Sequence, residues 1–155
     1  MRIGTGWDLH RLVSKRALVL GGVVIPSDKG EAAHSDGDVL VHAIIDALLG
    51  SLAKGDIGSH FPDTDPAYKD ADSMQLLKKV LSEDLPPYHI ENIDTTLILQ
   101  TPKLRPHIEA IRKNLAKAMG LKLEQVSVKA KTAEGILGEL GSGDAVIAQA
   151  TVLIS

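Results

Sequence analysis

The last segment of the chain, residues 144–154, constrains the fold more than any other. It is largely apolar at both odd and even positions, where Val146 and Ala148 alternate with Ile147 and Leu153. Because side chains of a strand alternate between its two faces, a strand of this composition is apolar on both sides. We expect it to be covered on both faces, either by the core of its own chain or by another subunit.

The rest of the chain alternates between strand-like and helix-like patterns. This alternation predicts one α/β domain over residues 1–155, an α+β sandwich in which a mixed sheet of four to five strands packs on helices. The predicted strands are 2–10, 89–100 and 125–131, with a hairpin at 17–25, and the predicted helices are 37–53, 72–83 and 106–120.

Capping residues set the expected helix ends. Ser35 or Asp36 is the expected N-cap of the first helix, after a loop at 31–34, and Asp72 or Ser73 that of the second. Pro106 and Gly120 are the expected first and last residues of the third. Residues 55–71 are rich in Gly, Pro and Asp, and such long irregular stretches are often functional.

Composition excludes several classes of protein. The net charge of −3 and the scarcity of aromatic residues, 3%, argue against a nucleic-acid binder. The absence of cysteine excludes disulfides and thiolate metal sites. The sequence contains no signal-peptide pattern and no apolar run of roughly 18 residues, so we expect a cytoplasmic protein that does not enter a membrane. If a transit peptide has been removed, the corresponding location is the plastid stroma.

Asp8, His10 and His42 are the strongest candidates for chemistry. Asp8 and His10 are two apart on a predicted strand and therefore point to one face, and His42 on a nearby helix would complete a set of three ligands. Three protein ligands with an open fourth position are typical of a catalytic zinc. Asp46, one turn after His42, is a candidate acceptor for its second ring N–H. A lone His is more often a packed or surface residue, and Asp46 is equally compatible with a solvated helix charge.

Three further segments carry polar side chains suited to a ligand. The loop that contains Gly55-Asp56-Ile57-Gly58 and residues 61–66 offers carboxylates to sugar hydroxyls, or else forms turns. Residues 103–105 lie between a predicted strand and a predicted helix, and residues 129–134 end another strand; ligands of open α/β sheets favour such strand ends. Their Lys and Thr side chains suit phosphate oxygens and Glu134 suits a divalent ion, although charged loops explain them as well. Gly4-Thr5-Gly6 lacks the third glycine of a dinucleotide fingerprint.

Taken together, these segments resemble the 2-C-methyl-D-erythritol 2,4-cyclodiphosphate synthases of the non-mevalonate isoprenoid pathway. The similarity runs from end to end, through Gly-Thr-Gly-Trp-Asp-Leu-His, Leu-Gly-Gly-Val, Ala-His-Ser-Asp-Gly-Asp-Val, His-Ala-Ile-Ile-Asp-Ala-Leu-Leu-Gly, Gly-Asp-Ile-Gly, Phe-Pro-Asp-Thr-Asp-Pro, Pro-Lys-Leu and Lys-Thr-Ala-Glu.

The resemblance implies a chorismate-mutase-like homotrimer with active sites between neighbouring subunits. It implies a phosphorus–oxygen lyase whose substrate is 4-diphosphocytidyl-2-C-methyl-D-erythritol 2-phosphate. In this reaction the 2-phosphate attacks the β-phosphorus, CMP leaves and a cyclic diphosphate forms. The work of the protein would then be positioning and charge neutralisation rather than general-base catalysis.

The resemblance also assigns roles to residues of this chain. It implies Zn²⁺ on Asp8, His10 and His42, and a second divalent cation, Mg²⁺ or Mn²⁺, on Glu134. His34 and Thr132 match positions that stabilise the transition state. The implied substrate-binding residues are Asp8, Leu9, His10, His34, Ser35, Asp56, Ile57, Gly58, Phe61, Pro62, Asp63, Thr64, Asp65, Leu99, Gln100, Thr101, Pro102, Lys103, Leu104, Arg105, Lys131, Thr132, Ala133 and Glu134.

Three positions depart from the family pattern. Ser142 and Gln149 align where members often have Arg and Glu, near a cavity on the trimer axis said to hold isoprenoid diphosphates. Losing the cation together with its carboxylate is a consistent change, and it argues against such a ligand here. Lys131 replaces a common Thr and adds positive charge beside Thr132.

Two other functions fit the same residues. A zinc phosphohydrolase would use a metal-bound water and give a linear product. A non-catalytic trimeric binding module would bind cytidine nucleotides without stoichiometric zinc.

Overall fold

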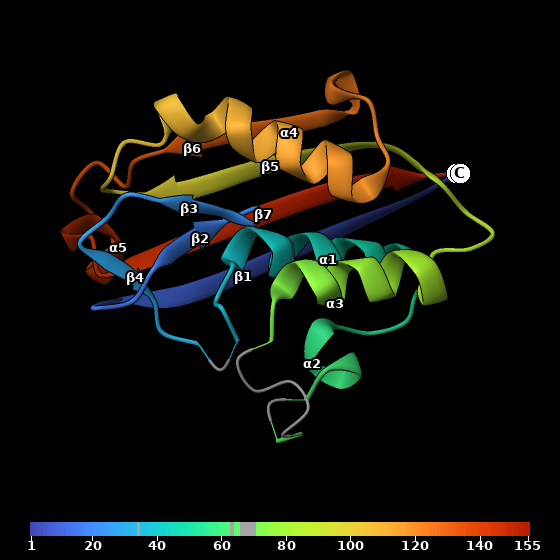
Figure 1. The fold of residues 1–155 in the computed structure, drawn as a ribbon, viewed down its shortest axis with the longest axis horizontal. Coiled ribbons are helices and arrows are strands. Elements are labelled where there is room, and N and C mark those ends of the chain that lie inside the picture. Colours follow the sequence, from blue (N-terminus) through green and yellow to red (C-terminus); the bar gives the residue numbers. More distant parts are fainter. Residues whose placement is uncertain (34, 63, 66–70) are drawn as a thin grey trace.

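The computed structural model describes residues 1–155 except 34, 63 and 66–70 (Figure 1). The strands are β1 (Arg2–Ser14), β2 (Leu18–Leu20), β3 (Val23–Ile25), β4 (Lys29–Glu31), β5 (Ile90–Leu99), β6 (Val126–Lys131) and β7 (Ala145–Ile154). The helices are α1 (Val39–Ser51), α2 (Ile57–His60), α3 (Ser73–Lys79), α4 (Ile108–Met119) and α5 (Glu139–Ser142), with a π-helical turn η2 (Val80–Asp84) and 3-10 turns η3 (Arg105–His107) and η4 (Leu123–Gln125).

The predicted mixed sheet packed on helices is confirmed. Five strands form one sheet in the order β4-β1-β7-β5-β6, in which β5 and β6 pair in parallel and the other neighbours are antiparallel. β2 and β3 form a separate hairpin, as expected. Helix α1 packs on β1 and β7, and α4 packs on β6, so these helices cover one face of the sheet (Figure 1).

The two faces of the central strand β7 differ in burial. Val146, Ala148, Ala150, Val152 and Ile154 face the helices and are all fully buried. Ile147, Thr151 and Leu153 on the other face are only partly buried, and Gln149 is exposed. The core of the chain therefore covers one apolar side of β7 and leaves most of the other side accessible.

We call this second side the open face and define it by Ile3, Trp7 and Leu9 of β1 and by Gln149 and Leu153 of β7. The register places Ile3 beside Leu153 and Trp7 beside Gln149. Ile3, Trp7 and Leu9 are 68%, 56% and 47% exposed, which is unusual for large apolar side chains on a sheet. A small cluster of Ala133, Leu140 and Ala145, packed against Ile98 and Ile147, covers one end of the face.

Gly4 and Gly6 let α1 lie directly against β1. A Cβ on Gly4 would overlap the backbone carbonyl oxygen of Ala47, and one on Gly6 would overlap that of Ala43. Only glycine permits such a close approach of two backbones. Gly4 and Gly6 do not belong to a dinucleotide-binding motif; they set the distance between the strand and the helix.

Some element ends differ from the predictions. Helix α1 begins at Val39 and its N-cap is Asp38, because that carboxylate accepts from the N–H of Val41; the expected caps Ser35 and Asp36 were wrong. The expected loop at 31–34 begins inside β4. The stretch expected to be irregular contains the one-turn helix α2, which Asp56 caps through the N–H of Ser59.

Some other helix ends agree with the predictions. Asp72 caps α3 through the N–H of Met74, and Gly120 ends α4 in the left-handed conformation, at φ 66°. The expected start of this helix at Pro106 was wrong, because Pro106 lies in the 3-10 turn before α4 and the helix begins at Ile108.

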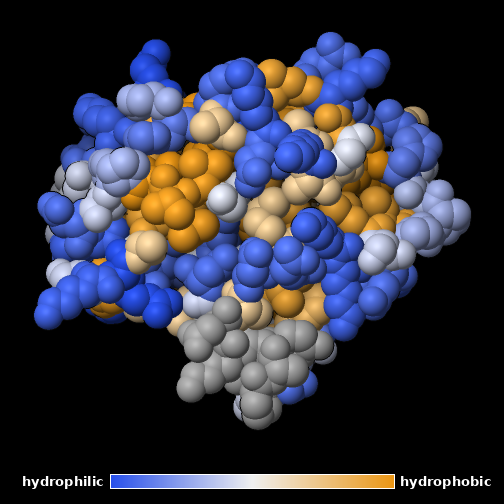
Figure 2. Space-filling view, viewed as in Figure 1, coloured by the Kyte–Doolittle hydropathy of each residue, from blue (hydrophilic) through white to orange (hydrophobic). Residues whose placement is uncertain are grey.

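The helix-covered side of the molecule has a mixed surface. Figure 2 shows it to be mostly hydrophilic, with apolar patches, one of which lies over the β2–β3 hairpin. Within the described part of the chain, every helix is too short or too polar to cross a bilayer.

We predict that Gly6→Ala destabilises the protein by about 1–3 kcal/mol, because the added methyl group forces α1 away from β1. Urea unfolding at fixed protein concentration measures the change. Gly50→Ala is the matched control on the same helix, since its Cβ would lie 3.7 Å from the Thr5 carbonyl oxygen, an ordinary contact. Equal stability of the Gly6→Ala and wild-type proteins would contradict the tight strand–helix contact.

Candidate active site

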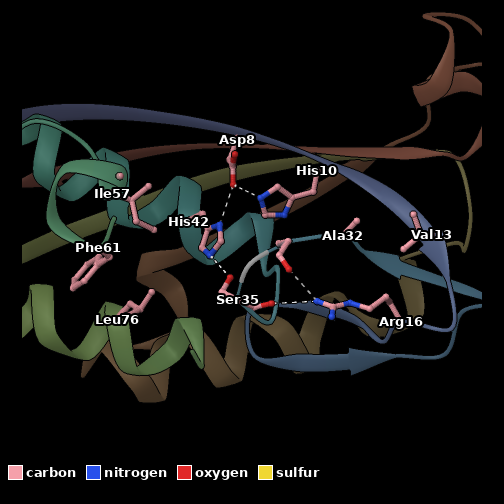
Figure 3. Close-up of a pocket in the computed structure, with 12 residues that line it drawn as sticks. Asp8, His10, Val13, Arg16, Ala32, Ser35, His42, Ile57, Phe61 and Leu76 are labelled. Carbon is pink, nitrogen blue, oxygen red and sulfur yellow. Dashed lines mark hydrogen bonds and ion pairs between the residues drawn. The ribbon is translucent and has the colours of Figure 1, made fainter. Parts of the chain in front are cut away.

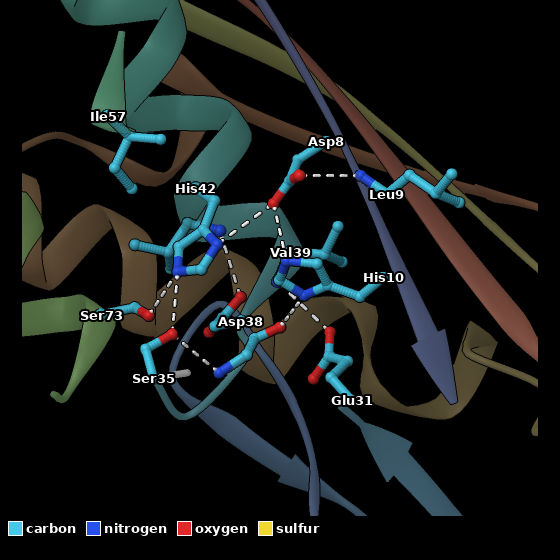
Figure 4. Close-up of polar contacts among 12 residues, drawn as sticks. Asp8, Leu9, His10, Glu31, Ser35, Asp38, Val39, His42, Ile57 and Ser73 are labelled. Atoms are coloured by element: carbon cyan, nitrogen blue, oxygen red, sulfur yellow. Dashed lines mark hydrogen bonds and ion pairs between the residues drawn. The ribbon is translucent and has the colours of Figure 1, made fainter. Parts of the chain in front are cut away.

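Asp8, His10 and His42 meet at the contact between β1 and α1. Asp8 and His10 point to the helix-covered face of β1, and His42 lies in the first turns of α1. One carboxylate oxygen of Asp8 lies 3.1 Å from His10 Nε2 and 3.1 Å from His42 Nδ1 (Figure 4). Within the described residues, this is the one group of three or more His, Asp or Glu side chains whose ligand atoms converge, all within 4.8 Å of one another.

This donor set fits a divalent metal ion. Ligand atoms bonded at about 2.0–2.1 Å to a tetrahedral ion lie about 3.3 Å apart, close to the two distances observed here. Two imidazole nitrogens and one carboxylate leave one position of such an ion for another ligand.

Hydrogen bonds on the outer ring nitrogens orient both histidines. Nδ1 of His10 donates to the carbonyl of Gly37 at 2.7 Å, which leaves Nε2 for an ion. Nε2 of His42 lies 2.9 Å from the Ser73 hydroxyl and 3.3 Å from the Ser35 hydroxyl, which leaves Nδ1. Ser73 was expected only as a possible helix cap, and its contact with His42, 31 positions away, has no signal in the sequence.

Asp46 does not fill the role expected for it. Its carboxylate accepts from the backbone N–H of Ile57 at 2.7 Å and so ties the start of α2 to α1. The i+4 spacing places Asp46 near His42, but the group that contacts His42 Nε2 at 2.9 Å is the Ser73 hydroxyl.

The protonation of the cluster suits metal binding. Burial alone would raise the pKa of Asp8, but hydrogen bonds from His10 and His42 hold that pKa well below its ordinary value. Burial opposes the charge on His10, yet its hydrogen bond to the Asp8 carboxylate raises its pKa. Since an ion must displace the proton from His10, metal affinity should fall as pH falls.

A cavity of about 780 Å³ opens beside the cluster. In Figure 3, Ile57, Phe61 and Leu76 lie at one end of this cavity and Arg16 lies at the other. The candidate metal ligands Asp8, His10 and His42 lie between the two ends. We call it the metal cavity. Its lining comprises Asp8, His10, Val13, Arg16, Ala32, Ala33, Ser35, His42, Ile57, Gly58, Phe61 and Leu76.

Arg16 is a further residue that sequence reasoning missed. Its guanidinium donates to the carbonyls of Glu31 at 3.1 Å, Ala33 at 3.3 Å and Ser35 at 3.2 Å. It thus braces the backbone on both sides of position 34. A single Arg between two strands carries no sequence signal for this role.

Several predicted residues lie near the metal cavity without lining it. The Leu9 side chain points to the open face, while its N–H donates to Asp8. Asp56 caps α2, and Pro62 and Asp65 close a turn of which Thr64 is part. His34 and Asp63 lie outside the described residues.

Most of the other predicted residues, but not Ala133 or Glu134, line a second cavity of about 480 Å³ at the ends of β5 and β6. We call it the strand-end cavity. It is lined by Leu99, Gln100, Pro102, Lys103, Leu104, Arg105, Ile108, Ala130, Lys131 and Thr132. Thr101 instead lines a neighbouring cavity with Lys29 and Ser142.

The turn after β6 is held by internal contacts. The side-chain oxygen of Gln100 accepts from the N–H groups of Ala133 and Gly135, and the Thr132 hydroxyl donates to the Glu134 carboxylate. Glu134 has a φ of 53°, in the left-handed region that few non-glycine residues adopt.

The structure does not bring the two groups of predicted residues together within one chain. The metal cavity and the strand-end cavity share no lining residue. In the sheet, β7 separates β1, which carries Asp8 and His10, from β5, which ends at Leu99.

Comparison with known proteins identifies the family. A sequence model of the YgbB family matches residues 1–155. The chain belongs to this family.

Curated relatives carry one name. A 2-C-methyl-D-erythritol 2,4-cyclodiphosphate synthase from Trichlorobacter lovleyi is 56% identical, over 99% of this chain and 98% of its own length. The protein of the same name from Clostridium perfringens is 54% identical, over 99% of both chains.

Solved structures share the fold. A 2C-methyl-D-erythritol-2,4-cyclodiphosphate synthase in a CDP-bound form has a TM-score of 0.91 and 39% identity, over 99% of this chain and 100% of its own. The bifunctional IspDF from Campylobacter jejuni has a TM-score of 0.93 and 38% identity, over 99% of this chain and 42% of its own.

Two buried acids support the loop behind the metal cluster. Asp38 accepts from the N–H groups of Gly21 at 2.9 Å and Gly22 at 2.6 Å, and Glu31 accepts from those of Val19 and Val39. Both side chains are fully buried. Burial, together with the negative charge of Asp38, raises the pKa of Glu31 to about 9, and burial raises that of Asp38 to about 6.

We predict that Glu31→Gln flattens the dependence of stability on pH. The folded state keeps a proton on Glu31 that the unfolded chain releases above its ordinary pKa of 4.5, so the free energy of unfolding should fall as pH rises from 5 to 9. This fall is at most about 1.4 kcal/mol per pH unit. Glutamine cannot lose the proton, so its variant should gain stability relative to wild type as pH rises.

Urea unfolding at pH 5.5, 7.0 and 8.5 measures this relative change. Glu124→Gln, on an exposed 3-10 turn, is the control and should follow wild type at each pH. Parallel pH curves for wild type and Glu31→Gln would show that Glu31 is ionised in the folded protein.

Proposed function

We propose that this protein converts 4-diphosphocytidyl-2-C-methyl-D-erythritol 2-phosphate to 2-C-methyl-D-erythritol 2,4-cyclodiphosphate and CMP. The observation that carries the proposal is the set of Asp8, His10 and His42, whose ligand atoms converge at the wall of a cavity. The name shared by the relatives supports the choice of substrate and reaction.

The proposed reaction is an internal displacement at phosphorus. An oxygen of the 2-phosphate forms a bond to the β-phosphorus, the bond from that phosphorus to the oxygen it shares with the α-phosphorus breaks, and CMP leaves with the electron pair. The nucleophile is already an anion, so the protein must align two negative groups and neutralise their repulsion.

The residues of the metal cavity suit this task. Asp8, His10 and His42 would hold Zn²⁺, since nitrogen and carboxylate ligands with one open position are typical of catalytic zinc. That ion would act as a Lewis acid toward a β-phosphate oxygen. Ser35 and the α2 residues Ile57 and Gly58 would contact the phosphate and the sugar-like part of the substrate. We assign His34 and Asp63 to the same group from the family resemblance alone.

The strand-end cavity would take the cytidine diphosphate part. Lys103, Arg105 and Lys131 bring three cations to its lining, as a diphosphate requires. Thr132 would stabilise the transition state, and Glu134 would hold the second divalent cation, Mg²⁺ or Mn²⁺, together with substrate phosphates.

We propose that the active protein is a homotrimer in which each site combines the metal cavity of one subunit with the strand-end cavity of its neighbour. The open face, with Ile3, Trp7 and Leu9 exposed, provides an apolar surface for assembly. In a cyclic, head-to-tail trimer each subunit contacts the next through two different surfaces. This arrangement can place the metal cavity of one subunit beside the strand-end cavity of its neighbour at all three interfaces.

We predict that phosphorus NMR of the product shows two coupled phosphates, with CMP released and no inorganic phosphate formed. A chelator should abolish the reaction, and added Zn²⁺ with Mg²⁺ should restore it. A linear product with solvent oxygen incorporated would instead identify a phosphohydrolase. Absence of a stoichiometric metal with retained cytidine nucleotide binding would identify a binding module.

We predict that His42→Ala loses the metal and at least about 10³-fold in activity, since a Lewis acid contributes several kcal/mol to the transition state. Metal analysis, CMP release and sedimentation velocity measure the three properties, and the trimer should survive. Normal CMP release by a metal-free His42→Ala protein would contradict the proposed mechanism.

We predict that inactive variants of the two halves complement each other. If His42→Ala and Thr132→Ala chains are co-expressed with different tags, about a quarter of the sites in randomly mixed trimers combine two intact halves. The mixed protein should then be far more active than either parent. Mixed trimers without recovered activity would place both halves of each site in one subunit.

A further inference from the structure

The outer nitrogen of His42 faces two hydroxyl groups on different elements. Nδ1 points to Asp8 and the metal cluster, while Nε2 lies 2.9 Å from Ser73 Oγ and 3.3 Å from Ser35 Oγ (Figure 4). His42 can therefore bind an ion through Nδ1 only if its remaining proton is on Nε2 and meets an acceptor.

Ser73 is placed to be that acceptor. It is the first residue of α3 and is fully buried. Its hydroxyl contacts a carboxylate oxygen of Asp36 at short range. A hydroxyl has one hydrogen to donate and a carboxylate can only accept, so the Ser73 hydrogen goes to Asp36 and its lone pair faces His42.

Asp36 is itself fixed in position. Its second carboxylate oxygen accepts from the N–H of Ser73 at 3.1 Å, and its first also accepts from the N–H of Asp38 at 3.2 Å. The N–H of Asp36 donates to the carbonyl of Ala71 at 3.1 Å. These bonds join the loop before α1 to the start of α3, so neither member of the pair can rotate freely.

We propose that Ser73 and Asp36 are positioning residues for the metal ligand His42. The hydrogen bonds run in one direction, from His42 Nε2–H to Ser73 and from the Ser73 hydroxyl to Asp36. This chain selects the tautomer that presents Nδ1 to the ion and holds the ring in place. The inference rests on the proposed function, because it assumes that the cluster holds a metal.

Ser35 is the weaker of the two partners. Its hydroxyl already accepts from the N–H of Gly37 at 3.1 Å, it lies farther from His42, and it is only partly buried. In the proposed site it also faces the substrate. Ser73 is buried and donates to Asp36 through both its N–H and its hydroxyl, so it is the residue that fixes the His42 ring.

The test is the zinc affinity of the folded protein, measured by competition with a chromophoric chelator. We expect Ser73→Ala to weaken Zn²⁺ binding by about 10- to 100-fold, the usual effect of losing an outer partner of a metal-bound His. Asp36→Asn should weaken it as well. The double variant should lose less than the product of the two single losses, because both changes break one chain of hydrogen bonds.

A matched control separates this role from general loss of a buried hydroxyl. Ser51→Ala, on the same helix as His42, removes a buried hydroxyl that donates to the Leu48 carbonyl, since Ser51 is 3% exposed. It should leave zinc affinity unchanged. With Co²⁺ in place of Zn²⁺, the visible absorption spectrum should change in Ser73→Ala and not in Ser51→Ala.

The outcomes are distinguishable. If the wild-type protein binds zinc and the zinc affinity of Ser73→Ala is within about twofold of the wild-type value, the positioning role is overturned and the proposed function stays intact. A larger loss in Ser35→Ala than in Ser73→Ala would overturn it in favour of Ser35. A wild-type protein without stoichiometric metal would overturn the metal centre itself. If Ser73→Ala does not fold, Asp36→Asn decides, since it keeps the size of the side chain.

Discussion

The contact between α1 and β1 is the constraint on which the rest of the structure depends. Gly4 and Gly6 allow the helix backbone to lie against the strand at a distance that any side chain would prevent. His42 then reaches Asp8 and His10, although 34 and 32 positions separate them in sequence. The same contact brings the loop before α1 over the cluster, where Gly37 orients His10 and Asp36 meets Ser73. A three-ligand site on two elements is possible here because Gly4 and Gly6 of the strand have no side chains that would hold the helix away.

Much of this arrangement could be predicted from the sequence. The alternating elements, the two-sided apolar strand and the Asp-x-His spacing on β1 are periodic patterns in the sequence. Such patterns depend only on the local geometry of a helix or strand, so they can be predicted without knowing the fold. What could not be predicted depends on contacts between distant segments. Ser73 replaces Asp46 beside His42 because α3 docks on the loop before α1, and no spacing rule encodes that docking. Asp38 caps α1 in place of Ser35 or Asp36 for a similar reason, since the Gly21 and Gly22 N–H groups of the hairpin hold its carboxylate. Arg16 braces the backbone around position 34 from between two strands, where a single cation has no distinctive pattern.

Each of the two cavities in one chain supplies only part of the chemistry that the proposed reaction needs. The metal cavity contains the three candidate metal ligands, and the strand-end cavity contains Lys103, Arg105 and Lys131 at the ends of two parallel strands. A substrate with a nucleotide at one end and a phosphorylated polyol at the other needs both. The separation of the two cavities by β7 and the apolar open face have a common explanation if neighbouring subunits complete each other, which is the arrangement that we propose.

The alternation along β7 has a consequence for how this strand can vary. Its buried set and its accessible set differ by a single position, so inserting or deleting one residue would exchange them. Gln149 and Thr151 would then enter the core, and Val146, Val152 and Ile154 would move outside. Point substitutions on the accessible side leave the register intact. The strand should therefore tolerate replacement of residues on that side but hardly any change in its length.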